Sequence, residues 1–328
     1  MEQRALGNTG RDVSVVGLGT WQLGADWGSV DESAALAVLD SAVDSGVTFF
    51  DTADVYGDGR SEQLIGRFRK SNPDIPLTVA TKMGRRLPKQ DPAAYTLENF
   101  REWNDRSRRN LGVDTLDLVQ LHCPPTAVYS TDAVFDALDT LVAEKRIAAY
   151  AVSVETCDEA LTAIARPGVA SIQIILNAFR TKPLEQVLPA AEKANVAIIA
   201  RVPLASGLLS GKYRHDTQFA ADDHRNYNRA GAAFDVGETF SGVDYDTGIE
   251  AAQEFSALAP DGASPAQLAL RWIIQQPGVT TVIPGARDAD QARANAASAD
   301  IPALTDATLQ AIADIYDRRI RATVHNRW

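Results

Sequence analysis

Short apolar runs alternate along the chain with longer stretches in which apolar residues recur at helical spacing. The runs are rich in Val, Ile, Leu and Phe. This alternation is typical of parallel strands joined by helices, and it predicts an α/β fold, the (β/α)8 or TIM barrel. The strands are expected at a first run leading into Gly17, and at 47–51, 77–81, 116–121, 148–153, 171–176, 196–202 and 280–283.

The first helix and the N-terminal segment carry local signals for their ends. The helix is expected to begin near Asp31, where Ser29 and Glu32 have capping-box spacing, and to stop at Gly46. Residues 4–16 predict a short β-hairpin that precedes the first barrel strand. No internal repeat, low-complexity tract or linker interrupts the pattern, so the sequence predicts a single domain over residues 1–328.

One long segment, 213–248, breaks the alternation. It follows the seventh predicted strand, is rich in Asp, Asn, Gly and Phe, and has no sustained period. A long irregular segment in a compact barrel is usually a functional lid or a mobile loop, and this one can reach the barrel mouth. Its two histidines, His215 and His224, are interpreted as solvated side chains, and no metal site is expected.

Composition narrows the class of protein. The chain has 328 residues with 32 basic and 43 acidic side chains, a net charge of −11, which argues against nucleic-acid binding. No apolar run reaches the ~18 residues of a membrane-spanning helix, and the N-terminus lacks the pattern of a signal peptide. Cys123 and Cys157 have no metal-ligand or disulfide spacing. A cytoplasmic location is expected.

Four ionisable residues fall where three successive strands are expected to end. Asp51 and Tyr56 follow the second strand, Lys82 follows the third, and His122 follows the fourth. Catalytic groups of such barrels come from the carboxyl ends of several different strands. Each residue alone has an ordinary explanation, such as a turn cap for Asp51 or a core hydrogen bond for His122. The barrel pattern places all four at one mouth, so we interpret them as catalytic.

These four side chains suit proton transfer at a carbonyl oxygen. A phenol titrates near pH ~10, and a neighbouring ammonium group should lower that value by stabilising the phenolate. Asp51 would hold Lys82 charged, Tyr56 would act as general acid, and His122 would donate a hydrogen bond to the substrate oxygen. None of them can donate hydride, so a cofactor must supply it. The pair Gly17 and Gly19 lacks the third glycine of a Rossmann fingerprint, so dinucleotide binding must use other groups.

With these residues in place, the chain resembles the aldo-keto reductase superfamily over essentially its whole length. The Asp, Tyr, Lys and His of that family correspond to Asp51, Tyr56, Lys82 and His122. The segments 17–21, 116–122, 203–212 and 283–287, together with Asn295, are also similar to family motifs. Within the superfamily, the chain is similar to the bacterial branch that includes the potassium-channel β-subunits. The resemblance implies that the N-terminal hairpin closes the floor of the barrel.

The resemblance also implies NADPH or NADP+ as the cofactor, held at the ends of strands five to eight. Ser153 and Gln173 would hold the nicotinamide amide, and Asn177 would add a polar contact. The segment 203–212 would wrap the pyrophosphate, with Lys212 supplying charge and the backbone of residues 206–211 supplying N–H donors. The expected cofactor contacts are Gly19, Thr20, Trp21, Asp51, Ser153, Gln173, Arg201, Pro203, Leu204, Ser206, Leu208, Ser210, Lys212, Ile283, Gly285, Ala286, Arg287, Gln291 and Asn295.

The phosphate end of the cofactor would meet a helix that starts near Asp288. The positive end of the helix dipole and the preceding Arg287 would both favour a phosphate group. We therefore expect NADPH to be preferred, with NADH accepted less well.

Three positions depart from the family pattern. Val154 stands where an Asn is common, so an amide contact is lost or is replaced through Glu155. Arg201 stands where an aromatic ring commonly stacks on the nicotinamide, and its charge would alter the electronics of that ring. Gln291 stands where several relatives carry a phosphate-binding Arg. These departures bear on cofactor affinity and leave the reaction class unchanged.

The sequence thus predicts an NADPH-dependent oxidoreductase that reduces aldehydes or ketones, with Trp21, Trp27, Tyr56 and His122 lining the substrate pocket. The expected partner is a small carbonyl or alcohol substrate, not a nucleic acid or a membrane. One alternative is a channel-associated or redox-sensing subunit that holds the cofactor with little turnover. Another is a phosphate-sugar isomerase barrel, which would bind no nucleotide. Oligomeric state and reaction direction stay open.

Overall fold

The computed structural model describes residues 1–24, 31–221 and 223–328. Its main sheet has eight parallel strands in the order β10-β9-β8-β7-β6-β5-β4-β3. The strands are β3 (Leu18–Gly19), β4 (Phe49–Asp51), β5 (Thr78–Met83), β6 (Leu118–His122), β7 (Tyr150–Ser153), β8 (Val169–Ile175), β9 (Ala197–Arg201) and β10 (Thr281–Val282).

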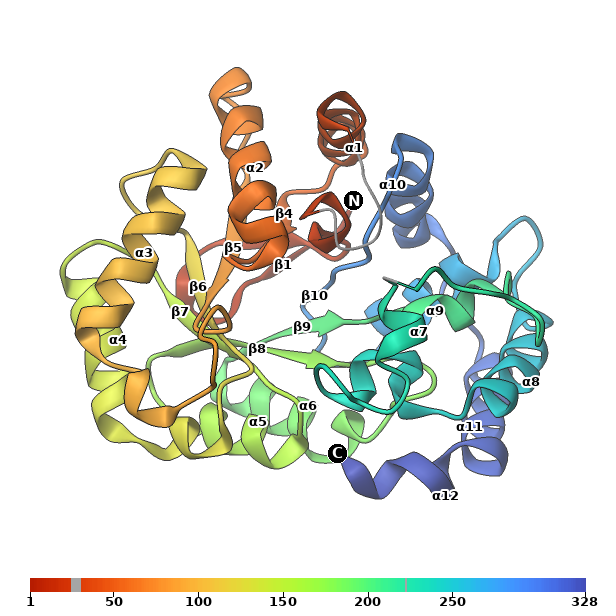
Figure 1. Ribbon diagram of the computed structural model, residues 1–328. Coiled ribbons are helices and arrows are strands. Elements are labelled where there is room, and N and C mark those ends of the chain that lie inside the picture. Colours follow the sequence, from red (N-terminus) through yellow and green to blue (C-terminus); the bar gives the residue numbers. More distant parts are fainter. Residues whose placement is uncertain (25–30, 222) are drawn as a thin grey trace.

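The two edges of this sheet meet, so the sheet closes into a barrel (Figure 1). Parallel bridges join Val16 to Val282 and Gly19 to Gly285. The Gly17 N–H donates to the Val282 carbonyl at 2.8 Å. The predicted TIM barrel is confirmed, and the seven strands predicted from residue 47 onward each overlap an observed one. The first strand was predicted to lead into Gly17, but it lies just after this residue, at Leu18–Gly19. Lys82, however, lies within β5 and not beyond its end.

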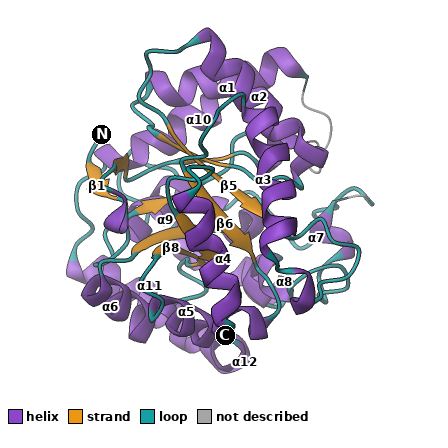
Figure 2. Cartoon of the chain, turned by 90° about the vertical axis from the view of Figure 1, so that its left-hand side faces the viewer, coloured by secondary structure: helices purple, strands orange, loops and turns teal. Residues whose placement is uncertain are grey.

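Helices surround the barrel and cover the outer face of its strands (Figure 2). Among the described residues, no helix is long and apolar enough to cross a membrane. The helices are α1 (Glu32–Asp44), α2 (Arg60–Ser71), α3 (Leu97–Leu111), α4 (Asp132–Ala143), α5 (Cys157–Ile164), α6 (Pro183–Ala194), α7 (His224–Tyr227), α8 (Tyr245–Ser256), α9 (Pro265–Ile274), α10 (Ala289–Ala296), α11 (Asp306–Arg319) and α12 (Arg321–Val324).

Helix α1 begins where the sequence predicts but with a different cap. The Asp31 side chain accepts a hydrogen bond from the Ala34 N–H at 2.9 Å, so Asp31 is the N-cap residue. Ser29, the predicted cap, lies outside the described residues. Gly46 follows the helix with φ of +87°, which supports its predicted role in ending the helix.

The barrel interior below the site is packed with small and medium apolar side chains. The antiparallel hairpin of β1 (Gln3–Ala5) and β2 (Asp12–Ser14) contributes Leu6 and Val13 to this cluster. The remaining buried members come from the strands and the residues beside them: Phe49, Ala80, Leu118, Ala151, Ala170, Ala197, Ile199 and Ile283. The hairpin therefore packs into the floor of the barrel, and the mouth at the opposite end is left for a site.

The segment predicted as a lid is more ordered than its sequence suggests. It forms short helical turns, including α7, and its last residues are the first turn of α8. Phe240 and Val243 are buried in the main hydrophobic core. His215 is exposed, as predicted, but His224 is only 2% exposed, so the interpretation of both histidines as solvated is wrong for His224.

Candidate active site

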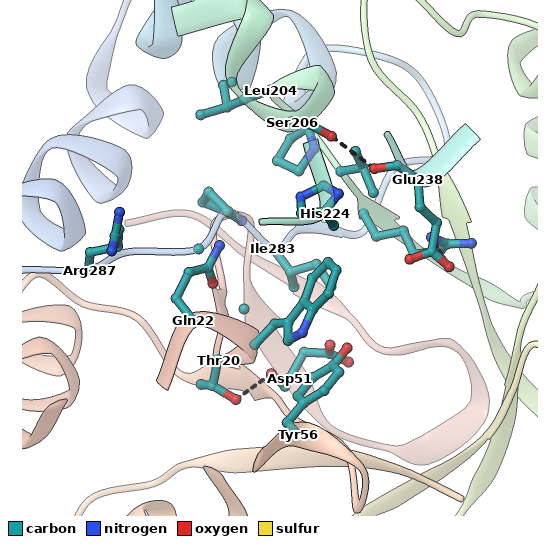
Figure 3. A pocket seen from close by; sticks show the side chains of 18 of the residues that line it. Thr20, Gln22, Asp51, Tyr56, Leu204, Ser206, His224, Glu238, Ile283 and Arg287 are labelled. Carbon is teal, nitrogen blue, oxygen red and sulfur yellow. Dashed lines mark hydrogen bonds and ion pairs between the residues drawn. The ribbon is translucent and has the colours of Figure 1, made fainter. Parts of the chain in front are cut away.

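The four predicted catalytic residues lie together at the carboxyl ends of the strands. Two of them, Asp51 and Tyr56, are labelled in Figure 3. Lys82 Nζ lies 2.5 Å from Asp51 Oδ1 and donates to Tyr56 OH at 3.2 Å. The same ammonium also donates to the Thr52 carbonyl at 2.9 Å. Asp51 therefore fixes the ammonium group, which in turn faces the phenol.

Strand register explains why residues distant in sequence share one level of the barrel. Gly19 is paired with Asp51 between β3 and β4. His122 is paired with Ser153, and Ser153 with Gln173, across β6, β7 and β8. Residues paired between neighbouring strands lie side by side on the same face of the sheet. The side chains of Asp51, His122, Ser153 and Gln173 turn inward at the rim of the barrel, where they line one cavity.

Tyr56 is held by a close approach of two loops. Gly57 adopts φ of +57°, and a Cβ at this position would lie 2.0 Å from the Gly24 carbonyl oxygen. A side chain on Gly57 would push the loops apart, so this glycine fixes the turn that presents Tyr56. The Trp21 ring stacks near the phenol, with the two ring centroids 6.0 Å apart.

Burial sets the protonation states of the site. Burial raises the pKa of Tyr56 above its ordinary value, although Lys82 opposes this. Lys82 thus acts in the predicted direction, but burial outweighs it, so the pKa of Tyr56 is raised and not lowered. Burial also opposes the charged form of Lys82, but Asp51 and Tyr56 outweigh it and raise the pKa of the ammonium. The site thus holds a protonated phenol beside a charged lysine, the state needed for a proton donor.

The second oxygen of Asp51 is held by two amides from neighbouring strands. Gln120 Nε2 donates to Asp51 Oδ2 at 2.9 Å, and Gln173 Nε2 donates to it at 2.7 Å. Gln120 was missed as a site residue, although it lies on the inward face of β6, two residues before His122. Gln173 Nε2 also donates to Gln120 Oε1 at 3.1 Å, so both N–H groups of this amide are engaged within the protein.

A cavity of about 370 Å³ extends from Tyr56 toward Arg287. In Figure 3, Asp51 and Tyr56 lie at the lower side, Arg287 at one end, and Ser206 and His224 opposite the tetrad. The predicted cofactor residues that line this cavity are Gly19, Thr20, Trp21, Asp51, Ser153, Gln173, Arg201, Pro203, Leu204, Ser206, Lys212, Ile283, Gly285, Arg287 and Gln291.

Five residues that were predicted to contact the cofactor do not line the cavity. Leu208 and Ala286 are buried, and Ser210 Oγ donates to the Gly207 carbonyl at 2.6 Å. Asn295 Nδ2 donates to the Gly285 carbonyl at 3.1 Å. Asn177 Nδ2 donates to the Val202 carbonyl at 2.9 Å and to Ser241 Oγ at 2.8 Å, so the amide supports the segment after β9. The polar side chains of Ser210, Asn295 and Asn177 therefore support the protein's own loops.

Several lining residues were not predicted, and most come from segments without a periodic pattern. They are Gln22, Val202, Gly207, Tyr213, His224, Arg225, Glu238 and Pro284. His224 packs 5.3 Å from the Trp21 ring, between ring centroids, and burial lowers its pKa to about 4. No local sequence signal distinguishes a buried histidine in such a segment from a solvated one.

The far end of the cavity carries the groups expected to meet phosphate. Asp288 caps α10, since its carboxylate accepts from the Gln291 N–H at 2.8 Å. Gln291 Oε1 accepts from the Arg287 N–H at 3.1 Å. Arg287 and Lys212 are exposed and line the cavity, so positive charge and a helix N-terminus lie together there.

A second cavity of about 790 Å³ adjoins the first. Trp21, Tyr56, His122 and Glu238 line both cavities, so the phenol lies where they meet. One part of the second cavity is apolar or aromatic, with Val55, Leu87, Pro88, Tyr227, Ala233 and Phe234. The other part is polar, with Arg85, Gln90, Cys123, Glu155 and Asp235. Trp27, predicted to line a substrate pocket, lies outside the described residues.

Two arginines and two glutamates form a largely buried ion network between the cavities. Arg201 Nη2 lies 2.8 Å from Glu155 Oε2, and Arg201 Nη1 lies 3.6 Å from Glu238 Oε1. Arg85 Nη1 lies 3.1 Å from the same Glu238 oxygen. Burial opposes ionisation of Glu238, but Arg85 and Arg201 outweigh it and lower its pKa to about 2. The charge of Arg201 is therefore compensated, and Glu155 is bound to Arg201.

In the part of the chain that the structure describes, one group of three potential metal ligands is found, and the two glutamates of this network belong to it. Cys123, Glu155 and Glu238 offer ligand atoms within 4.8 Å of one another. Arg85 and Arg201 already neutralise the two carboxylates, and burial raises the pKa of the Cys123 thiol. A neutral thiol and two paired carboxylates are a poor donor set for a cation.

The chain belongs to the aldo-keto reductase family. A family model described as "Aldo/keto reductase family" matches residues 15–317. The aldo-keto reductase YhdN of Bacillus subtilis is 29% identical over 303 residues, which are 90% of this chain and 87% of the relative. A probable voltage-gated potassium channel subunit beta from Arabidopsis thaliana is 28% identical over 336 residues, 96% of each chain. The predicted relationship to the channel subunits is thus confirmed.

Two further similarities bear on the reaction. The aldo-keto reductase yakc [NADP(+)] of Schizosaccharomyces pombe is 27% identical over 322 residues, 96% of this chain and 91% of the relative. The solved structure of the glycerol dehydrogenase AKR11B4 from Gluconobacter oxydans has a TM-score of 0.78 and 30% identity, covering 95% of this chain and 94% of that one. The chain is therefore an oxidoreductase of this family.

Proposed function

We propose that this protein is an NADPH-dependent carbonyl reductase in which Tyr56 is the general acid. The observation that carries the proposal is the position of Tyr56 OH, 3.2 Å from Lys82 Nζ and at the junction of two cavities. The first cavity would hold the cofactor, and the second would hold an aldehyde or ketone. The reverse oxidation of an alcohol uses the same residues.

The residues of the first cavity fit a nicotinamide dinucleotide. Arg287, Lys212 and the N-terminus of α10 offer positive charge at the end far from Tyr56. Gln173 and Ser153 offer polar atoms beside the tetrad. When bound, the cofactor would supply hydride to the carbonyl carbon.

The protein's own residues would supply the proton and exclude water. Tyr56 keeps its proton until the substrate oxygen gains charge and then donates it from its hydroxyl group. Lys82, held by Asp51, stabilises the phenolate that remains. Trp21 stacks on the phenol and is itself packed against His224, while Tyr56 lines both cavities.

A preference for NADPH over NADH is supported by two observations. Arg287 lies beside the start of α10, where a guanidinium group and the helix dipole could act on one phosphate. The relative yakc carries NADP(+) in its name. The acidic candidate for binding ribose hydroxyls, Asp288, caps α10 and accepts from Gln291 Nε2 at 2.6 Å.

A cofactor-holding subunit with little turnover is the second candidate, favoured by the similarity to a channel β-subunit. The complete tetrad and the substrate-sized second cavity support an enzyme instead. We further propose that residues 1–328 act as one domain on a small molecule, with no role for nucleic acid or membrane.

Tyr56→Phe tests the proposal. Turnover of simple aldehydes should fall by ~10²–10⁴-fold, because the proton donor is lost, while the Kd for NADPH stays nearly unchanged. Tyr245→Phe is the matched control, since Tyr245 OH bonds the Arg214 carbonyl away from both cavities. Tight NADPH binding with negligible wild-type turnover would favour the cofactor-holding subunit. Absence of any nucleotide binding would favour the isomerase alternative.

A further inference from the structure

His122 receives a hydrogen bond where the sequence predicts that it gives one. Arg85 Nη1 lies 3.3 Å from His122 Nε2 in hydrogen-bonding geometry. A guanidinium group has donors and no acceptor, so Nε2 must be the acceptor. A neutral imidazole then carries its proton on Nδ1, and this atom is buried with no partner among the described residues. In this arrangement Nε2 has no proton to offer a substrate.

The surroundings of His122 keep the ring neutral. Burial lowers its pKa well below the ordinary value, and the positive charges of Arg85, Lys82 and Arg201 act in the same direction. The Tyr56 ring meets His122 edge-on, with centroids 5.9 Å apart. Protonation to an imidazolium would restore a donor at Nε2, but burial and the three neighbouring positive charges oppose it.

Arg85 has donors that the protein leaves unused. Its Nη1 serves both His122 and Glu238. Within the described ranges, neither its Nη2 nor its Nε makes a hydrogen bond, and the side chain is 24% exposed. Arg85 also lines the second cavity together with Tyr56 and His122. A cation with unused hydrogen-bond donors thus lines the proposed substrate cavity and contacts His122 of the tetrad.

We propose that Arg85 is a further catalytic residue, which supplies the second hydrogen bond to the substrate oxygen in place of His122. The inference rests on the proposed carbonyl reductase function. The substrate oxygen would receive its proton from Tyr56 and would be stabilised by the Arg85 guanidinium, which keeps its own protons throughout. His122 and Glu238 are positioning residues, because they hold Arg85 Nη1 from two sides.

The role suits a guanidinium group. It stays charged at all working pH values, and its planar fork can serve fixed protein acceptors and a substrate oxygen together. A donor aimed at an oxygen that gains charge in the transition state is typically worth ~10²–10³-fold in kcat. Glu238 compensates the charge of Arg85 in the resting site, so the cation does not require an anionic substrate.

The tautomer of His122 gives a test that does not depend on turnover. The chain has four histidines, so long-range ¹⁵N–¹H NMR of histidine-labelled protein can resolve each ring. We expect His122 to be neutral with the proton on Nδ1, with and without bound NADP+. In Arg85→Met, Nε2 loses its donor and the Nε2–H tautomer should appear. An Nε2–H tautomer in the NADP+-bound wild type would overturn the inference.

Kinetics separate a catalytic role from a structural one. Arg85→Met should lower kcat for simple aldehydes by ~10²-fold or more and leave the Kd for NADPH nearly unchanged. Arg85→Lys should recover part of that loss, because an ammonium group can still donate. The matched control is Arg86→Met, since Arg86 pairs with Asp58 and does not line the second cavity.

The outcomes distinguish the inference from the proposed function. An active wild type with an unchanged kcat in Arg85→Met would overturn the role of Arg85 alone. A wild type with no turnover of any carbonyl would overturn both. Should Arg85→Met fail to fold, Arg85→Lys and the tautomer of the wild type still decide the question.

Discussion

Glu238 and Arg85 form an ion pair, with 3.1 Å between Oε1 and Nη1, that ties the segment after β9 to the loop after β5. The two residues are separated by 153 positions in sequence. The backbone of Glu238 is fixed as well, since its carbonyl accepts from Ser206 Oγ at 2.8 Å. The segment 213–248 is thus held across the mouth of the barrel by an ion pair and by a hydrogen bond to its backbone.

Glu238→Gln should therefore loosen this segment and weaken the protein in a pH-dependent way. Because the folded pKa of Glu238 is depressed to about 2, ionised Glu238 stabilises the fold above its unfolded pKa. That contribution is lost as the pH falls from ~4 through about 2. Urea unfolding across this range should show a steeper acid loss of stability in the wild type than in Glu238→Gln.

The same variant should release cofactor faster, which stopped-flow fluorescence can measure. Glu254→Gln is the control, because Glu254 pairs with Arg318 and Arg319 on the surface, far from the mouth. Equal rates of cofactor release in both variants would contradict the proposal that Glu238 holds the segment 213–248 across the mouth.

The tetrad and the barrel were readable from sequence because they follow from strand spacing. Asp51, Lys82 and His122 lie on or beside strands whose period and ends are visible as apolar runs. Arg85 and Glu238 lie in non-periodic segments, and their contact depends on how two loops meet in space. Local pattern carries no information on such a contact.

The net pKa shift of Tyr56 could not be predicted from the sequence, for a different reason. Its charged neighbour is visible in the sequence, but the loss of water around the phenol is not. In the structure the burial effect outweighs the ammonium, and the pKa rises. Asn295 and Ser210 show a similar limit, since their motif positions match the family while their polar atoms bond the protein's own backbone.

Lys82→Met should raise the pKa of Tyr56 further, because the neighbouring charge that opposes the burial effect is removed. Turnover should collapse, and the basic limb of the pH profile for kcat/KM should move to higher pH. Loss of one partner from a buried ion pair also costs about 3–5 kcal/mol, although Gln120 and Gln173 still hold Asp51. Lys70→Met, at an exposed position of α2, is the control. An unchanged pH profile in Lys82→Met would break the proposed coupling.

Arg287→Ala tests which dinucleotide the first cavity prefers. Losing a charged hydrogen-bond partner costs ~1.5–3 kcal/mol, or roughly ten- to a hundred-fold in affinity. The KM for NADPH should rise by that factor, while the KM for NADH should barely change. Arg293→Ala, in the nearby helix α10, is the control, because Arg293 pairs with Asp290 and does not line the cavity. Equal losses with both cofactors would place Arg287 on the pyrophosphate and remove the argument for NADPH.

Asp54, two residues before Tyr56, should make the stability of the fold decrease as the pH rises, the opposite of the effect expected from Glu238. Its carboxyl is buried, Oδ1 has no partner among the described residues, and burial together with Glu62 raises its pKa to about 7. The fold therefore favours the protonated form. The stability that this form contributes is fully present below the unfolded pKa of ~3.9 and is lost as the pH rises through about 7.

Asp54→Asn cannot ionise and should avoid this loss. Each pKa unit corresponds to ~1.4 kcal/mol, so the variant should exceed the wild type by ~1–3 kcal/mol near pH ~8 and match it near pH ~4. Urea unfolding at the two pH values measures the difference. Asp74→Asn, at an exposed position, controls for the loss of one negative charge. A wild type that is the more stable protein at pH ~8 would mean that ionised Asp54 gains a compensating partner, since burial alone can only disfavour its charge.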